Sequence, residues 1–404
     1  MKTFLLLLCA LSFSAVVAQK ITWKHLSSTT GDLEKPWNGV EQTAALVGDL
    51  NNDGLNDFVL TCRKKAPCAV WYERVKNGWK RHIIDSTMLT VEAGGVLYDI
   101  DGDGDLDIVF GGDWQSNEVW WWENPYPATD QVWKRHIIKK GGGTQHHDQV
   151  IGKFKHNEAA QLVFWNQSDK TLYLADIPKD PKQSPWEYKA IYIANTDDEK
   201  HGSYVEGTAK GDVDGDGFDD IIAGDHWFKY DPSTGLFKAI RYADAAGRVA
   251  AGKLVKGSKM LQIVVSPGDG EGFAKWYECK GDPENSADWI GHDLIGRKLI
   301  HGHTLQIADI DGDGNLDIFI AEMAKWTESS DKPNNPNAEA FILYGDGKGN
   351  FRKELFATGL DFHEGKIADL DGDGDMDILY KPYNLETPRV DIWLQNGTGK
   401  RKKK

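Results

Sequence analysis

The stretch Asp99-Ile-Asp101-Gly-Asp103-Gly-Asp105-Leu-Asp107 decides the fold of this chain. Related acidic stretches recur along the sequence, beginning at Asp49, Asp212, Asp309 and Asp369. A short run of small and β-branched residues precedes each copy, and an apolar run follows it. This pattern is typical of two short strands joined by an acidic turn.

Two further units keep the flanking strands but lose the acids, at 152–154 and 252–254. Counted from six residues before the motif, the seven units begin at Thr43, Ala93, His147, Glu206, Gly247, His303 and His363. Successive starts lie 41 to 60 residues apart, which is the period of four-stranded propeller blades. The sequence therefore predicts an all-β chain, a seven-bladed β-propeller of four-stranded antiparallel blades that forms one domain over residues 19–404.

The N-terminal strand is expected to close the propeller. The last unit supplies three strands, at 366–370, 376–380 and 390–394. The segment 21–26 is similar to the outer strand at 79–84 of an earlier unit. Its pairing with the last blade would leave no free sheet edge.

Residues 1–18 are typical of a cleaved signal peptide, which predicts a secreted or periplasmic protein without a membrane span. The net charge of −15, from 62 acidic and 47 basic residues, argues against a nucleic-acid partner. Cys62 and Cys68 are close enough in sequence to bridge one hairpin. Cys279 has no evident partner.

The Asp-x-Asp-Gly-Asp-Gly loop between two propeller strands resembles the FG-GAP, or VCBS-type, repeat of integrin-like propellers. The resemblance extends over nearly the whole chain after the signal peptide. It implies a propeller fold, whereas the adhesive function of those propellers does not transfer with the fold.

The acidic loops are predicted to bind up to five Ca²⁺ ions. Oxygen ligands stand at positions one, three, five and nine, a backbone carbonyl is available at seven, and glycine at six permits the turn. An EF-hand is disfavoured because a bidentate glutamate at position twelve is absent, and a metal-free acidic turn would leave many carboxylates repelling one another. The expected ligands are Asp49, Asn51, Asp53, Asp57, Asp99, Asp101, Asp103, Asp107, Asp212, Asp214, Asp216, Asp220, Asp309, Asp311, Asp313, Asp317, Asp369, Asp371, Asp373 and Asp377. Lys153 and Lys253 take position one in the degenerate units, as ammonium substitutes for the ion or as ordinary exposed lysines.

A second metal site is predicted on the opposite face, where the chain leads into each inner strand. Metal-capable side chains occupy the same register in four units: His147, Glu206, His303 and His363. Thr43, Ala93 and Gly247 stand there in the other three, which leaves an open side for substrate. Imidazoles with one carboxylate suit Zn²⁺ or Mn²⁺.

Other side chains divide into structural and ligand-binding candidates. Outer-strand histidines beside tryptophan, such as His82 and His136, are interpreted as packing residues. The loops between second and third strands open on the face of the predicted central site. Their aromatic and polar groups suit a carbohydrate ligand, although the tryptophans are equally consistent with rim packing. These candidates are Asp113, Trp114, Trp165, His226, Trp227 and Tyr383.

The phrases His146-His-Asp-Gln, His301-Gly-His-Thr and Phe362-His-Glu-Gly are similar to the propeller domain of aldos-2-ulose dehydratases. The resemblance implies a sugar lyase. The leading hypothesis is therefore metal-dependent β-elimination on a keto-sugar or uronate-containing saccharide, with His146, His301 or Tyr204 as acid or base and Arg248 near the developing enolate. The alternatives are a non-catalytic glycan- or protein-binding propeller and a metal-dependent hydrolase.

Overall fold

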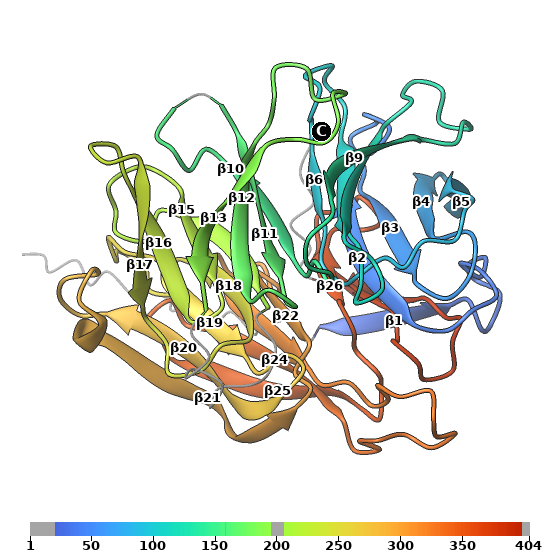
Figure 1. The fold of residues 1–404 in the computed structure, drawn as a ribbon. Helices are drawn as coiled ribbons and strands as arrows, with labels where there is room; N and C mark the ends of the chain where they lie inside the picture. Colours follow the sequence, from blue (N-terminus) through green and yellow to red (C-terminus); the bar gives the residue numbers. More distant parts are fainter. Residues whose placement is uncertain (1–20, 158, 195–205, 398–404) are drawn as a thin grey trace, which may run out of the picture.

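The computed structural model describes residues 21–157, 159–194 and 206–397. These residues form seven sheets of four antiparallel strands each, which are arranged as a propeller in Figure 1. This confirms the predicted fold class.

The blades follow one another along the chain. Blade one contains β2 (Gln42–Gly48), β3 (Asp57–Cys62), β4 (Ala69–Val75) and β5 (Gly78–Asp85). Blade two contains β6 (Val96–Tyr98), β7 (Asp107–Gly111), β8 (Glu118–Glu123) and β9 (Lys134–Lys140). Blade three contains β10 (Gln149–Gly152), β11 (Gln161–Asn166), β12 (Thr171–Asp176) and β13 (Tyr188–Ile193). Blade four contains β14 (Thr208–Gly211), β15 (Asp220–Ala223), β16 (His226–Asp231) and β17 (Leu236–Arg241).

Blade five contains β18 (Arg248–Gly252), β19 (Gln262–Ser266), β20 (Glu271–Cys279) and β21 (Trp289–Ile300), which a 3-10 turn, η2 (Ser286–Asp288), precedes. Blade six contains β22 (Thr304–Ala308), β23 (Asp317–Ala321), β24 (Glu339–Gly345) and β25 (Phe351–Thr358). Blade seven contains β26 (Lys366–Ala368), β27 (Asp377–Tyr380), β28 (Asp391–Asn396) and β1 (Thr22–Ser27). In the described part of the chain, no helix is both long and apolar enough to cross a bilayer.

The first strand closes the ring, as predicted. β1 pairs antiparallel with β28, with Thr22 opposite Asn396 and Ser27 opposite Asp391. Figure 1 shows β1, in blue, beside the red C-terminal strands. This non-covalent pairing gives the last blade its fourth strand and covers the outer edge of β28.

The core is a ring of apolar clusters, one at each seam between neighbouring blades. The seam of blades one and two, for example, packs Trp71 against Phe110 and Trp122. On the outer strands, His82 stacks on Trp71 with ring centroids 4.6 Å apart, and His136 stacks on Trp121 at 4.4 Å. These contacts confirm the packing interpretation of the outer-strand histidines.

The disulfide that the spacing of Cys62 and Cys68 would allow is not formed. Both thiols are free and buried. The Cys62 side chain packs in the cluster shared with blade seven, whereas the Cys68 side chain packs in the cluster shared with blade two. The two side chains therefore lie on opposite faces of blade one and cannot meet.

Candidate metal centre

Three of the four predicted central ligands converge. His147, Glu206 and His303 lie just before the inner strands of blades three, four and six. Each offers one ligand atom, and these atoms lie within 4.8 Å of one another. All three residues are buried, with exposures of 1 to 3 %. Inner strands pointing the same way around one axis bring together side chains that are far apart in sequence.

The His147 imidazole is oriented by its neighbour. Asp148 Oδ2 lies 2.7 Å from His147 Nδ1, which leaves Nε2 as the nitrogen available to the centre. Burial alone would lower the pKa of His147, but the Asp148 carboxylate outweighs it and raises that pKa to about 10. Arg248 donates to both Asp148 oxygens, at 2.6 and 2.8 Å. A carboxylate that fixes a histidine in this way is a recurrent feature of metal sites.

Glu206 has one carboxylate oxygen that is hydrogen-bonded and one that is not. Its Oε1 accepts a hydrogen bond from the backbone of Asp269 at 2.8 Å, whereas its buried Oε2 has no hydrogen-bond partner among the described residues. Burial, together with the Asp269 carboxylate, raises the pKa of Glu206 to about 8. Gly268 makes this approach possible, since a Cβ at that position would lie 1.7 Å from Oε1.

His303 lies close to the carboxylates of both Glu206 and Asp269. Its Nε2 lies 3.5 Å from Glu206 Oε2 and 3.6 Å from Asp269 Oδ1. Burial lowers the pKa of His303 to about 3, which favours its neutral form. The pKa of His147 is raised in the metal-free fold, so a bound cation would have to displace the proton from His147. Two nitrogens and one carboxylate oxygen lie around a common point, and the carboxylate oxygen accepts no hydrogen bond among the described residues. This donor set fits a Zn²⁺- or Mn²⁺-type ion.

The fourth predicted ligand, His363, lies outside this group. Its ring stacks on His303 with centroids 4.3 Å apart and planes 20° apart. Its Nδ1 lies 2.7 Å from Nζ of the buried Lys381. Burial lowers the pKa of Lys381 well below its usual value, and a second bond runs from its Nζ to the carbonyl of Gln42 at 2.8 Å. His363 therefore supports His303 from the side.

The open side of the centre is formed by residues of the loops in blades five and six. The Asp269 side chain is 34 % exposed, and its Oδ1 lies 3.8 Å from His301 Nδ1. The His301 ring, 17 % exposed, stacks on Trp326 with centroids 3.8 Å apart. Of the groups around the centre, these are placed to meet a molecule that arrives from solvent.

The remaining catalytic candidates occupy different surroundings. His146 is fully buried, its Nε2 lies 3.0 Å from the Asn166 amide, and burial lowers its pKa to about 3. Arg248 is bound to Asp148 and Glu364, the latter at 2.5 Å. Tyr204 lies outside the described residues. The structure thus brings His301 to the open side and assigns Arg248 to the support of His147.

The candidate ligand-binding residues separate by exposure. Trp114 is 59 % exposed on the loop between β7 and β8, on the face of the centre. Trp165 and Trp227 are core residues, with exposures of 2 and 0 %, so stacking of these two on an external sugar is ruled out and the packing alternative holds. Tyr383 lies beside His363, with centroids 4.9 Å apart.

The other two polar candidates, His226 and Asp113, lie against charged side chains of the protein. His226 Nδ1 lies 2.8 Å from Asp225. Asp113 is fully buried, with an oxygen 3.8 Å from the Arg63 guanidinium.

Sequence reasoning gave Lys381 and Trp326 no role at this centre. The position of Lys381 gives a weak indication of a role, because it stands in a loop between the second and third strands of its blade. Such loops open on the predicted functional face. Trp326 lies in the long segment between β23 and β24, and nothing in its local sequence indicates contact with His301.

The acidic loops on the opposite face also gather carboxylates. In four of them the residues at positions one, three and nine lie within 4.8 Å of one another: Asp99, Asp101 and Asp107; Asp212, Asp214 and Asp220; Asp309, Asp311 and Asp317; Asp369, Asp371 and Asp377. In blade one, Asn51 stands at position three between Asp49 and Asp53, and its amide lies 3.3 Å from Asp53. The hard oxygen donors gathered in the other four loops fit a Ca²⁺-type ion.

The aspartate at position nine also accepts a hydrogen bond from the loop backbone in each of the five acidic loops. The Asp107 carboxylate accepts hydrogen bonds from the backbone of Ile100 and of Asn124, both at 2.9 Å. It thereby ties the acidic loop to the end of the third strand. Burial and repulsion from neighbouring aspartates raise the pKa at position nine to about 7 or 8, at Asp57, Asp107, Asp220, Asp317 and Asp377.

The two degenerate blades keep the hydrogen bond from the loop backbone to position nine, but an uncharged glutamine stands there in place of the aspartate. Gln161 accepts from the backbone of Phe154 at 2.9 Å, and Gln262 accepts from the backbone of Val255 at 2.9 Å. The Lys253 ammonium donates to the loop carbonyls of Ser258 and Lys259. An amide replaces the carboxylate in these loops, and in blade five an ammonium bonds to the loop as well.

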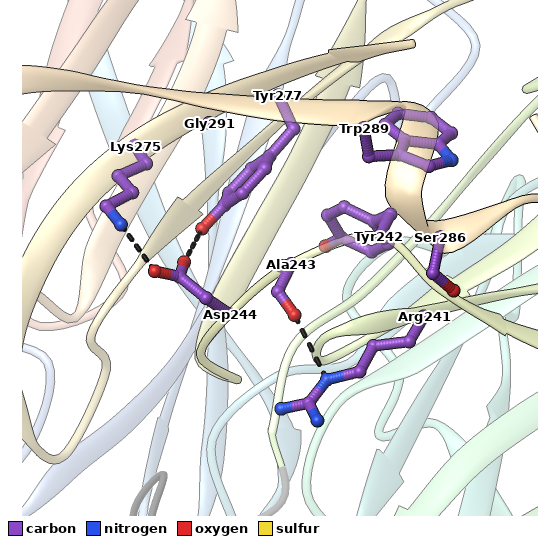
Figure 2. Close-up of a pocket in the computed structure, with 9 residues that line it drawn as sticks. All are labelled: Arg241, Tyr242, Ala243, Asp244, Lys275, Tyr277, Ser286, Trp289 and Gly291. Atoms are coloured by element: carbon purple, nitrogen blue, oxygen red, sulfur yellow. Dashed lines mark hydrogen bonds and ion pairs between the residues drawn. The ribbon is translucent and has the colours of Figure 1, made fainter. Parts of the chain in front are cut away.

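A separate pocket of about 530 Å³ lies at the seam of blades four and five (Figure 2). Its polar side chains are paired with protein groups. Asp244 binds both Lys275 and the Tyr277 hydroxyl, and the Trp289 indole donates to a backbone carbonyl. The central site differs from this pocket because the buried Oε2 of Glu206 accepts no hydrogen bond from the described residues.

Comparison with known proteins extends these observations. Residues 309–380, which span the acidic loops of blades six and seven, match the FG-GAP-like repeat family. The chain carries an FG-GAP-like repeat. No curated protein matches the chain in sequence.

Solved structures with a similar fold share little sequence with this chain. BBS1N, solved in complex with ARL6DN, is 11 % identical with a TM-score of 0.52, over 89 % of this chain and 94 % of that one. Rhamnogalacturonan lyase YesW is 14 % identical with a TM-score of 0.49, over 89 % and 74 %. The Bacillus licheniformis rhamnogalacturonan lyase PL11 is 14 % identical with a TM-score of 0.45, over 92 % and 75 %. At these identities the similarity concerns the fold alone.

Proposed function

We propose that this protein is a secreted, metal-dependent carbohydrate lyase that performs β-elimination on a keto-sugar or a uronate-containing saccharide. The observation that carries the proposal is the meeting of His147, Glu206 and His303, with a buried carboxylate oxygen that accepts no hydrogen bond from the described residues. Three protein ligands leave room for a substrate oxygen, which is the arrangement of catalytic rather than structural sites.

The ion supplies Lewis acidity when bound, polarising a sugar carbonyl or carboxylate and acidifying the neighbouring C–H. His301 is our candidate for the base that takes this proton, since it lies on the open side beside Asp269. The leaving oxygen is β to the deprotonated carbon. Trp114, exposed on the same face, and Trp326, beside His301, offer flat apolar surfaces typical of sugar sites.

The acidic loops on the opposite face complete the proposal with structural Ca²⁺. Their carboxylates are close together and partly buried, so in a metal-free fold they repel one another. A divalent cation in each loop would remove that repulsion and fix the turn between the two inner strands of the blade.

A non-catalytic glycan-binding or protein-binding propeller is the second candidate. The low exposure of His147, Glu206 and His303 favours it, because a closed metal centre can serve structure alone. In that case the face around Trp114 and Trp326 would hold its ligand without turnover.

The test is an activity screen of the purified chain on keto-sugars and uronate oligosaccharides, with and without added Zn²⁺ or Mn²⁺. We expect metal-dependent absorbance of a conjugated enone or an unsaturated uronate, lost in Glu206→Gln. The control is His292→Gln, since His292 pairs with Glu278 on an outer strand. New reducing ends without that absorbance would indicate a hydrolase, and ligand binding without product would indicate the binding propeller.

A further inference from the structure

The five acidic loops differ in the residue that faces them from the third strand. The second and third strands pair in the same register in each blade, so that one third-strand residue lies opposite position nine. This residue is Glu73, Glu123, Lys229, Tyr344 or Leu394 in blades one, two, four, six and seven. Blade four is the one of these five that places a cation there.

Lys229 uses that position to contact the ion ligands directly. Its ammonium forms a close ion pair with Asp214, at position three, and lies 3.4 Å from Asp216, at position five. A third carboxylate, Glu284, lies 3.7 Å away. The Asp214 side chain is 6 % exposed and Lys229 is 27 % exposed, so this contact is shielded from solvent.

Other loops have weaker contacts with basic side chains. In blade two, Lys182 reaches Asp101 at 3.1 Å, but it comes from a loop of blade three, is 42 % exposed and is shared with Glu123. It touches one ligand position instead of two. In blade one the third-strand residue is a carboxylate, Glu73. It lies 3.5 Å from the Asn51 amide, so it places a further oxygen acceptor beside the acidic loop.

We propose that Lys229 is a built-in competitor for the metal of blade four, so that this loop binds Ca²⁺ more weakly than the other four acidic loops. The inference rests on the proposal that the acidic loops bind calcium. Asp214 and Asp216 are carboxylates that a calcium ion would need. Their charge-assisted contacts with the ammonium must be broken or weakened before they coordinate the ion, which lowers the affinity about 10-fold or more.

The same chain offers a precedent in blade five. There the acids are lost and the Lys253 ammonium bonds to the loop carbonyls. In blade four the acids remain and the ammonium comes from the third strand. Lysine thus bonds to the loop of blade five and to the loop of blade four by different routes. Because blade four keeps its carboxylates, an ion could replace the lysine there.

The experiment is a calcium titration of the full chain after removal of metal with EDTA, followed by calorimetry or by competition with a fluorescent chelator. The wild type is expected to show four tighter sites and one weaker site. In Lys229→Met the weak site tightens about 10-fold or more, because its carboxylates are no longer paired. Asp214→Asn deletes the weak site and leaves the four tight ones.

Lys238→Met is the matched control. Lys238 lies on the fourth strand of the same blade and pairs with Glu284 at 2.7 Å without touching a ligand of the loop. It should leave all affinities unchanged. A thermal melt adds a second readout: in EDTA, Lys229→Met unfolds below the wild type, and in excess calcium this difference shrinks or reverses.

Five sites of equal affinity in the wild type would overturn the inference, as would a Lys229→Met titration identical to the wild type. A wild type that binds no calcium would instead refute the calcium proposal on which it rests. The two failures are therefore distinguishable.

Discussion

The Asp148 carboxylate lies 2.7 Å from Nδ1 of His147, in the chain position directly after it. The same carboxylate accepts two bonds from Arg248 and one from the backbone of Gly207 at 2.6 Å. One aspartate of blade three thus contacts the start of the first strand of blade four and the first strand of blade five, and it fixes the orientation of an imidazole at the candidate metal centre.

Asp148→Asn is expected to weaken binding of the central metal by about 10 to 100-fold, because His147 loses the carboxylate that orients it. The measurement is metal content per chain after dialysis against graded chelator, with a melt to show that the variant is folded. Glu278→Gln, which alters the carboxylate paired with His292 on an outer strand, should retain the wild-type metal content. Equal retention in both variants would contradict the role of Asp148.

Calcium is expected to stabilise the protein more at pH 8 than at pH 5.5. In the metal-free fold the pKa at position nine is raised to about 7 or 8, at Asp107 and Asp377 for example, against about 4 in the unfolded chain. A raised folded-state pKa contributes stability at low pH, and this contribution is lost as the pH rises through 7 to 8. Calcium takes the place of the protons and restores the lost stability.

The measurement for this prediction is the melting temperature at both pH values, with EDTA and with excess calcium. The quantity of interest is the difference caused by calcium, since the contributions of buried histidines cancel in it. A calcium effect of the same size at both pH values, or a larger one at pH 5.5, would show that these carboxylates do not hold the ion.

Gln161→Ala is expected to destabilise the fold by about 1 to 3 kcal/mol, because it leaves the buried backbone N–H of Phe154 without its acceptor. The loss should be the same in EDTA and in calcium, since blade three lacks the acidic ligands. Asp107→Ala removes the equivalent brace in blade two together with an ion ligand. Its cost should therefore be larger in calcium than in EDTA. Denaturant unfolding in both buffers compares the two variants.

Trp114→Ala and Trp165→Ala should separate ligand binding from stability. Trp114 is 59 % exposed, so its removal is expected to leave stability within about 0.5 kcal/mol of wild type and to weaken saccharide binding. Trp165 is 2 % exposed in the seam of blades three and four, so its removal should cost about 3 to 5 kcal/mol. The measurements are saccharide titration and thermal unfolding on the same samples. If Trp165 stacked on the sugar, Trp165→Ala would lose saccharide binding and keep its stability.

The sequence by itself determined the architecture and the place of the candidate metal centre. The acidic turn at Asp99 to Asp107 repeats often enough to mark the blades, and the likeness of segment 21–26 to an outer strand marked the closure. These features are encoded locally, in strand alternation and turn chemistry. The register of His147, Glu206 and His303 was also visible, because equivalent positions of different blades face one axis.

Only the tertiary structure decided what each side chain does at that axis. Lys381 holds His363 beside the centre, Asn166 holds the buried His146, and Asp269 takes the open side. In the same way, the clusters at the blade seams separate Cys62 from Cys68 and bury Trp165. These outcomes depend on side-chain rotamers and on partner residues from other blades. The local sequence repeat predicts neither.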